Sequence, residues 1–133
     1  MFAPDLSGHA GLPSGMVVSN LAAALGEHAA VMEPHLARHA EYEREVFTAL
    51  NTARLRDGAF VLMPRNQKCA TPVQLLFVST QVEAAAYPRC LVIAEAGSEC
   101  TVVEDYVSLG DAVHFNDAVT EVVVSVTGAS ASV

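Results

Sequence analysis

The first part of the chain has apolar positions at helical spacing, after a lead-in rich in glycine and proline. Residues 1–16 carry Pro and Gly at short intervals, which predicts a flexible lead-in. Residues 17–25 place apolar side chains on one helical face behind Ser19, a residue type that favours a helix N-cap. We therefore expect a first helix here, loosened or ended by Gly26.

Two further helices are expected before the pattern changes. Pro34 fits the first position of a helix, where its missing N–H costs nothing. Phe47, Leu50 and Leu55 then predict a last short helix that packs on an apolar surface. Residues 17–56 are thus predicted to form an N-terminal helical region.

After residue 57 the hydrophobic pattern becomes that of short strands. We expect strands at residues 59–63, 73–80, 90–95, 100–107 and 114–126, a loop at 81–88 and a fraying tail at 127–133. Several strands are apolar on both sides, which indicates that both faces are covered. Short strands with turns every ~8–12 residues are typical of a sandwich, a barrel or a β-solenoid.

Composition narrows the classes of partner. The chain has 133 residues, which favours one domain, and 52% of them are hydrophobic, which argues against disorder. Seven Lys and Arg face 15 Asp and Glu, for a net charge of −8. Nucleic acid and anionic membranes attract clustered cations, so neither is an expected partner.

The expected compartment is the cytoplasm. No apolar run reaches the ~18 residues that indicate a membrane span, and the first residues lack the pattern of a secretory signal. The three cysteines form no CxxC motif and are odd in number, so no disulfide framework is expected. Reduced thiols are typical of a cytoplasmic protein.

A pair of histidines with a nearby glutamate is the first group of candidate metal ligands. His35 and His39 lie four residues apart, with Glu43 a further turn on, which places them on one face of the predicted helix. The segment between the histidines is Leu-Ala-Arg, so there is no HExxH motif, and a solvated helix face is the favoured interpretation. We assign no metal site to this chain.

The cysteines are candidate cluster ligands or reactive thiols. Cys69, Cys90 and Cys100 are too dispersed for the usual iron–sulfur spacings. Cys90 and Cys100 fall inside apolar strands, where free cysteine acts as a small hydrophobic residue. Cys69 follows Lys68, whose positive charge makes this thiol the one candidate for reactivity.

Acidic residues crowd the strand region. Carboxylates can serve acid–base catalysis or bind a hard cation, but at strand ends they more often face water and protect edges. We favour exposure for all six: Glu95, Glu99, Glu104, Asp105, Asp117 and Glu121. His114 near Asp117 invites a dyad, yet no GxSxG, P-loop or GxGxxG motif accompanies it. No catalytic or cofactor-binding residue is assigned.

Several segments, in order, resemble one protein family. They are residues 47–53, 57–61, 72–80, 88–97, 101–107 and 116–123, and the resemblance extends over about residues 17–126. The sequence resembles a SufD-like member of the SufB/SufD family, in its N-terminal and central part only. None of these segments is a catalytic motif, and their common order carries the resemblance.

The resemblance implies a fold and a set of partners. It implies an N-terminal helical region followed by a right-handed parallel β-helix, here incomplete. The expected parts are a lead-in at 1–16, helices at 17–56, the partial β-helix core at 57–126 and a flexible tail at 127–133. Family members form a scaffold with SufB and the ATPase SufC that assembles iron–sulfur clusters, and SufD-like subunits are linked to iron acquisition.

The chain also departs from the family pattern. The family's cluster-related residues, its SufC-binding segment and much of its β-helix lie beyond the matched part, so no functional residue is carried over. The chain therefore resembles a front half: a fragment, a truncated product or a degenerate copy. A stack that stops midway exposes a strand edge, which favours self-association.

The leading hypothesis is a truncated SufD-like scaffold subunit, cytoplasmic, not an enzyme and binding no cofactor alone. The first alternative is a small β-sandwich or barrel that binds a ligand or partner, and antiparallel hairpins would identify it. The second is a metal-dependent enzyme of cupin-like form, which needs converging His and carboxylate ligands.

Overall fold

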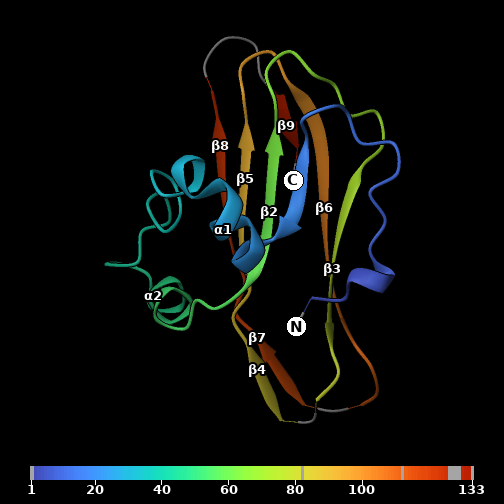
Figure 1. The fold of residues 1–133 in the computed structure, drawn as a ribbon. Helices are drawn as coiled ribbons and strands as arrows, with labels where there is room; N and C mark the ends of the chain where they lie inside the picture. The colour runs from blue at the N-terminus through green and yellow to red at the C-terminus, as the bar shows by residue number, and fades with distance from the viewer. Residues whose placement is uncertain (1, 82, 112, 126–129, 133) are drawn as a thin grey trace.

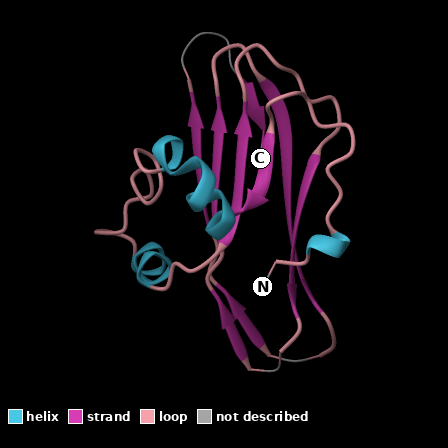
Figure 2. Cartoon of the chain, in the orientation of Figure 1, coloured by secondary structure: helices cyan, strands magenta, loops and turns pink. Residues whose placement is uncertain are grey.

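The chain is mainly β, with two helices ahead of most of its strands (Figures 1 and 2). The structure, a computed structural model, describes residues 2–81, 83–111, 113–125 and 130–132. Its elements are a short 3₁₀ helix η1 (Pro4–Leu6), β1 (Val17–Asn20), α1 (Leu21–Met32), α2 (Val46–Ala53), β2 (Gly58–Met63), β3 (Val73–Ser79), β4 (Ala84–Ala86), β5 (Arg89–Ala94), β6 (Glu99–Ser108), β7 (His114–Asn116), β8 (Val119–Val124) and β9 (Ser130–Ser132).

The described strands form three sheets, with the orders β1-β2-β5-β8, β3-β6-β9 and β4-β7. Consecutive strands from β2 onward lie in different sheets (Figure 1). Each of β2 to β6 pairs with the third strand after it, so three strands make one circuit of the chain. Arg89 lies opposite Gly58, and Val119 lies opposite Arg89, so one circuit takes about 30 residues. The path therefore repeats itself through all three sheets.

Strand direction decides between the expected architectures. Every described pair is parallel except β1 with β2, which lie far apart in the sequence. A sandwich or an up-and-down barrel of hairpins would be built from antiparallel neighbours, and cupin-like folds are as well. The described strands show no such hairpins and close no barrel, so the alternative of a sandwich or barrel is not observed. The prediction of a mainly β fold with N-terminal helices is confirmed.

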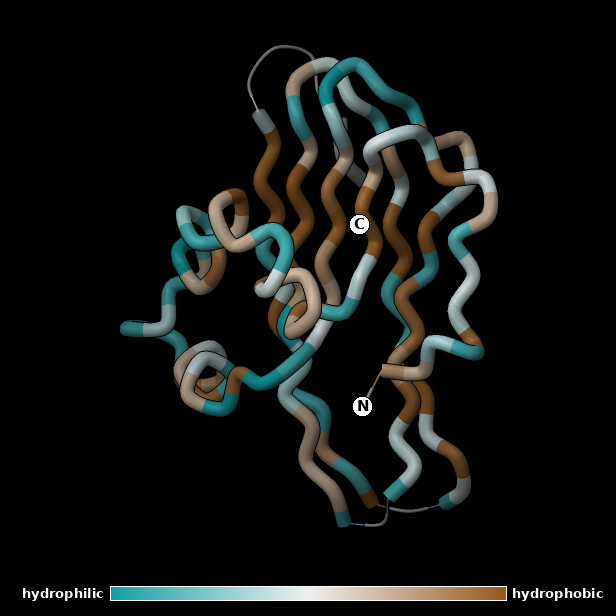
Figure 3. Tube along the Cα trace, viewed as in Figure 1, coloured by the Kyte–Doolittle hydropathy of each residue, from teal (hydrophilic) through white to brown (hydrophobic). Residues whose placement is uncertain are grey.

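The sheet of β2 and β5 has a hydrophobic core on each side. Val61 and Val92 point between the sheets, toward Val102 on β6. Phe60 and Leu91 alternate with them and pack on the other side, where α1 covers the sheet (Figure 2). Figure 3 shows hydrophobic residues concentrated along the strands. The two-sided apolar pattern expected from the sequence is thus confirmed for β2 and β5, whereas β3 and β6 alternate buried and exposed residues over their first positions.

The first predicted helix begins later than expected. Residues 17–20 form β1 and α1 starts at Leu21, so Ser19 is not the N-cap. β1 pairs antiparallel with β2, because its β-branched valines suit an extended strand that covers the open edge of β2. The carboxylate of Asp57, distant in sequence, accepts the N–H of Ala22 at 3.3 Å at the helix start.

The helix predicted from Pro34 does not form. α1 runs through Gly26 to Met32, with an irregular residue at His28 (φ −124°, ψ 20°), and residues 33–45 form turns. Ala37 has a φ of 57°, in the left-handed region that ends a right-handed helix. The expectation of a last short helix is confirmed by α2.

The strand region differs from the prediction at three places. The expected strand 114–126 is two strands, β7 and β8, because the chain changes sheet after Asn116. The expected loop 81–88 contains β4, whose three alanines carry too little pattern to predict. Part of the expected flexible tail, Ser130–Ser132, pairs with β6 as β9, while residues 126–129 and 133 lie outside the described part of the chain.

A tight approach between neighbouring circuits generates a stability prediction. A Cβ added to Gly58 would collide with the backbone oxygen of Arg89, which belongs to the sheet and cannot shift without disturbing it. We expect Gly58→Ala to lower the free energy of unfolding by about 1–3 kcal/mol in urea titrations. The control is Gly26→Ala, since nothing lies within 4 Å of its added Cβ. We expect that variant to gain up to about 1 kcal/mol from helix propensity. An equal effect of both substitutions would contradict the collision.

Candidate functional site

The most densely bonded group of polar side chains surrounds Arg89, the first residue of β5. Its side chain is 0% exposed, and its Nε donates to Glu121 Oε2 on β8 at 3.0 Å. Its Nη1 donates to Asn51 Oδ1 at 3.1 Å and to Thr52 Oγ1 at 3.3 Å, both on α2. Arg89 therefore joins the helical segment to two adjacent strands.

Asn51 binds both neighbouring circuits of the chain. Its side-chain Nδ2 donates to the carbonyl oxygens of Pro88 at 2.9 Å and Asp117 at 2.7 Å. Pro88 directly precedes β5, and Asp117 lies two residues before β8. Asn51 is fully buried, and its side-chain amide provides hydrogen-bond partners for these two backbone carbonyl groups. The side chain fixes α2 at the start of both strands.

Glu121 accepts hydrogen bonds from the turn that follows α1. Its carboxylate accepts the backbone N–H groups of Ala37, Arg38, His39 and Ala40 at 2.7–3.1 Å. The left-handed Ala37 begins this run of consecutive donors, an arrangement that binds anions. Burial by itself raises the pKa of Glu121, but the N–H donors and Arg89 outweigh it, so the pKa lies below its usual value. Glu121 is therefore held as a carboxylate.

Two atoms of this group have no hydrogen-bond partner among the described residues: Arg89 Nη2 and Asp117 Oδ2. Asp117 is 7% exposed, and burial raises its pKa while the nearby Arg89 opposes the rise. Asp117 and Glu121 were predicted to face water, and that prediction is wrong for both. Glu121 lies on the side of β8 that faces the helical segment, Asp117 lies just before β8, and the charge of Arg89 acts on both.

The remaining acidic residues lie closer to the surface. Glu99 is exposed and pairs with Lys68 at 2.7 Å, which agrees with the prediction. Glu95, Glu104 and Asp105 are half-buried and accept hydrogen bonds from neighbouring residues. The carboxylate of Glu104 accepts the hydroxyl group of Thr120 at 2.8 Å, and this bond links β6 to β8.

The histidine pair is brought together without the predicted helix. His35 Nδ1 and His39 Nε2 are 3.1 Å apart and their rings stack, but they lie in the turns after α1. Among the described residues, no three His, Cys, Asp or Glu side chains lie where they could hold a metal ion. His114 lies on β7, and Asp117 follows that strand.

All three cysteines are free and buried. Burial, with a smaller contribution from Glu104, raises the pKa of Cys90 to about 12. This value fits the predicted role of Cys90 as core filler. Cys69 is 8% exposed, and the amine of the neighbouring Lys68 is directed to Glu99, not left free beside the thiol.

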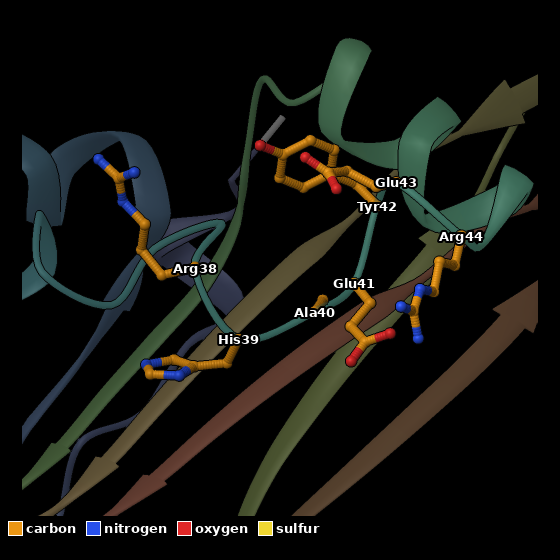
Figure 4. A pocket seen from close by; sticks show the side chains of 7 residues that line it. All are labelled: Arg38, His39, Ala40, Glu41, Tyr42, Glu43 and Arg44. Atoms are coloured by element: carbon orange, nitrogen blue, oxygen red, sulfur yellow. The ribbon is translucent and has the colours of Figure 1, made fainter.

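The described part of the chain has hollows on its surface. One, of about 310 Å³, lies along residues 38–44. In Figure 4 the side chains of Arg38 and Arg44 point away from each other. Another, of about 810 Å³, lies between the lead-in and β3 and is lined largely by apolar atoms.

Fold and site together define a mainly β protein of stacked parallel strands, with a helical segment held by hydrogen bonds to a buried ion pair between two strands. The chain belongs to the SufBD family: the profile of the SufBD protein N-terminal region matches residues 1–75. No helix formed by the described residues has both the length and the apolar character needed to span a membrane.

Individual relatives agree with this assignment. The chain is 32% identical over 121 residues to the iron–sulfur cluster assembly protein SufD of Bacillus subtilis, covering 90% of this chain and 27% of that protein. It is 34% identical over 110 residues to an iron–sulfur cluster assembly SufBD family protein of Synechocystis, covering 79% of this chain and 23% of the relative. A chloroplastic SufBD family protein of Arabidopsis thaliana is 29% identical over 85 residues, 64% of this chain and 15% of its own length. The chain thus spans about a quarter or less of these relatives.

The buried ion pair gives a prediction for stability. We expect Glu121→Gln to lower the free energy of unfolding by about 3–5 kcal/mol, because Arg89 would keep a buried charge without a counter-ion. The measurement is urea unfolding at neutral pH. Glu99→Gln is the matched control, since its ion pair is exposed and contributes little to stability. Similar losses for both variants would contradict the role of burial.

The pKa of Glu121 gives a prediction for pH. The folded chain holds this carboxylate at a pKa below the ordinary value of 4.5, so its contribution to stability is present above pH 4.5. That contribution is lost as the pH falls through the folded pKa. We expect the stability difference between wild type and Glu121→Gln to shrink below about pH 4.5, measured by urea unfolding across pH. A constant difference down to pH 3 would contradict it.

Proposed function

We propose that this chain is a SufD-like scaffold subunit that takes part in iron–sulfur cluster assembly together with SufB-like and SufC-like proteins. The relatives described above are iron–sulfur cluster assembly proteins, and the family membership of this chain supports the same role. The chain spans only part of those proteins. The activity and partners of a whole relative are therefore proposed for it.

The observation that carries a scaffold role is the repeated circuit of parallel strands. We infer that β2–β3–β4, β5–β6–β7 and β8–β9 are successive turns of a parallel β-helix, incomplete in this chain. Parallel crossovers are nearly always right-handed, which gives the expected hand. In such a stack the side chains fill the interior, and the strand edges and outer faces are left for partners.

One sheet edge is the natural surface for a partner. β1 covers β2 at one end of its sheet, and among the described strands none pairs with the outer side of β8. Val122 and Val124 on β8 are 38% and 42% exposed. An edge with free backbone groups and apolar side chains accepts a further strand. We place a SufB-like partner, or a second copy of this chain, on this edge.

We further propose that this chain by itself catalyses no reaction. It is not an enzyme, it binds no cluster by itself, and it works in the cytoplasm. Its Arg89 group positions the helical segment and is not a catalytic residue set. Reconstitution of the purified chain with iron and sulfide, followed by absorption spectroscopy, is expected to show no bound cluster.

The partner proposal is tested by co-purification. A tagged chain is co-expressed with the SufB-like and SufC-like proteins of the same organism, and we expect it to retain the SufB-like protein. The variant Val122→Lys/Val124→Lys places charges on β8 at the open end of the stack and is expected to lose most of that retention. Its melting temperature is measured alongside, so that a loss of binding is told from a loss of folding. The control is Val113→Lys, at a side chain 79% exposed away from that edge. If the folded wild type retains neither protein, the partner proposal fails, although the family membership stands.

A further inference from the structure

Two cysteines lie side by side on neighbouring circuits of the chain. Lys68 and Glu99 form an isolated parallel bridge. The N–H of Cys69 donates to the carbonyl of Glu99 at 2.8 Å, and the N–H of Glu99 donates to the carbonyl of Gln67 at 2.9 Å. The next pair after this bridge is Cys69 and Cys100. In-register residues of parallel strands point to the same side of a sheet.

Both thiols lie in the same apolar interior. Cys69 is 8% exposed and Cys100 is 3% exposed, and they share one hydrophobic cluster with Val73 and Val102. Burial raises the pKa of Cys100, and Cys69 adds to the rise, which means that the two thiols are close enough to interact. Neither thiol is in a disulfide in this structure.

The spacing suits a bond that forms and breaks. Neighbouring strands lie about 4.8 Å apart, within the Cα separations of disulfides, about 4.4–6.8 Å. The Cβ atoms of a disulfide are about 3.5–4.5 Å apart, so the two residues must approach slightly. Cys69 lies outside the strands, since β3 begins only at Val73, so this approach need not displace a residue within β3. A mildly strained bond of this kind is more easily reduced.

We propose that Cys69 and Cys100 are a redox pair that forms a reversible disulfide between the first two circuits of the chain. The oxidant is a small-molecule disulfide of the glutathione class. This inference does not depend on the proposed function, since it uses only the geometry of the two thiols.

The reaction proceeds by two thiol–disulfide exchanges. Cys69 is the more exposed thiol and attacks first, after its Sγ leaves the carbonyl of Thr71, now 3.2 Å away. The oxidant's S–S bond breaks, one small thiol departs, and a mixed disulfide forms on Cys69. The Cys100 thiolate then attacks Cys69 Sγ and displaces the second small thiol. The two protons of the protein thiols end on the two products, and the oxidant gains two electrons.

Cys90 is the internal control for this chemistry. It lies on β5 and is 1% exposed, and its partners in register are Ala59 on β2 and Thr120 on β8. No cysteine stands next to it on either strand. Its substitution by serine therefore leaves the proposed pair intact.

The test is mass spectrometry of the folded chain. The wild type and the variants Cys69→Ser, Cys100→Ser and Cys90→Ser are incubated with oxidised glutathione, quenched with acid, and digested without reduction. We expect the wild type and Cys90→Ser to lose two hydrogen atoms and to yield one linked peptide pair that contains residues 69 and 100. Cys69→Ser and Cys100→Ser are expected to yield no linked pair.

A second readout separates a native link from one made in unfolded chains. The oxidised wild type should melt at a higher temperature than the reduced chain, and a thiol reductant should reverse both the link and the shift. Three results would overturn the proposal: no linked peptide, a link that includes Cys90, or a link that forms only in denaturant.

Discussion

The buried ion pair of Arg89 and Glu121 is the constraint on which the arrangement of this molecule depends. Both side chains are almost completely removed from water, a state that is costly unless each charge has a partner and each polar atom a hydrogen bond. Here Asn51 and the backbone of residues 37–40 supply the additional bonds. The charges can therefore be buried only when α2, the turn after α1, β5 and β8 are all in place.

This requirement makes the helical segment and the strands a single cooperative unit. The turn at residues 37–40 obtains its hydrogen bonds from a residue about 80 positions later, so its left-handed start at Ala37 has no local cause. α1 depends on the strands as well, through Asp57 at its N-terminus and Phe60 beneath it. Loss of β8 would thus disturb residues that are far away in sequence.

The sequence predicted what depends on local periodicity and missed what depends on distant partners. The strands at β2, β3, β5 and β6 follow from apolar runs bounded by turn residues, and their direction follows only from the family resemblance. Val17 and Val18 were assigned to a helix, because only the free edge of β2 makes a strand favourable there. Glu121 was assigned to the surface as a strand-end acid. One signal was available: Arg89 is a lone charge at the head of an apolar strand, and a buried arginine requires a carboxylate.

Apolar stacking alone does not determine which circuit lies on which, since one valine ladder resembles the next. The polar contacts do so, because they need particular residues at particular separations. Arg89 with Glu121, and Asn51 with the carbonyls of Pro88 and Asp117, join the second circuit to the third. Between the first and second circuits the described contacts include the exposed pairs of Lys68 with Glu99 and of Gln74 with Asp105, which contribute little to stability. A covalent link at the adjacent cysteines would therefore reinforce a junction at which the described residues form no buried ion pair.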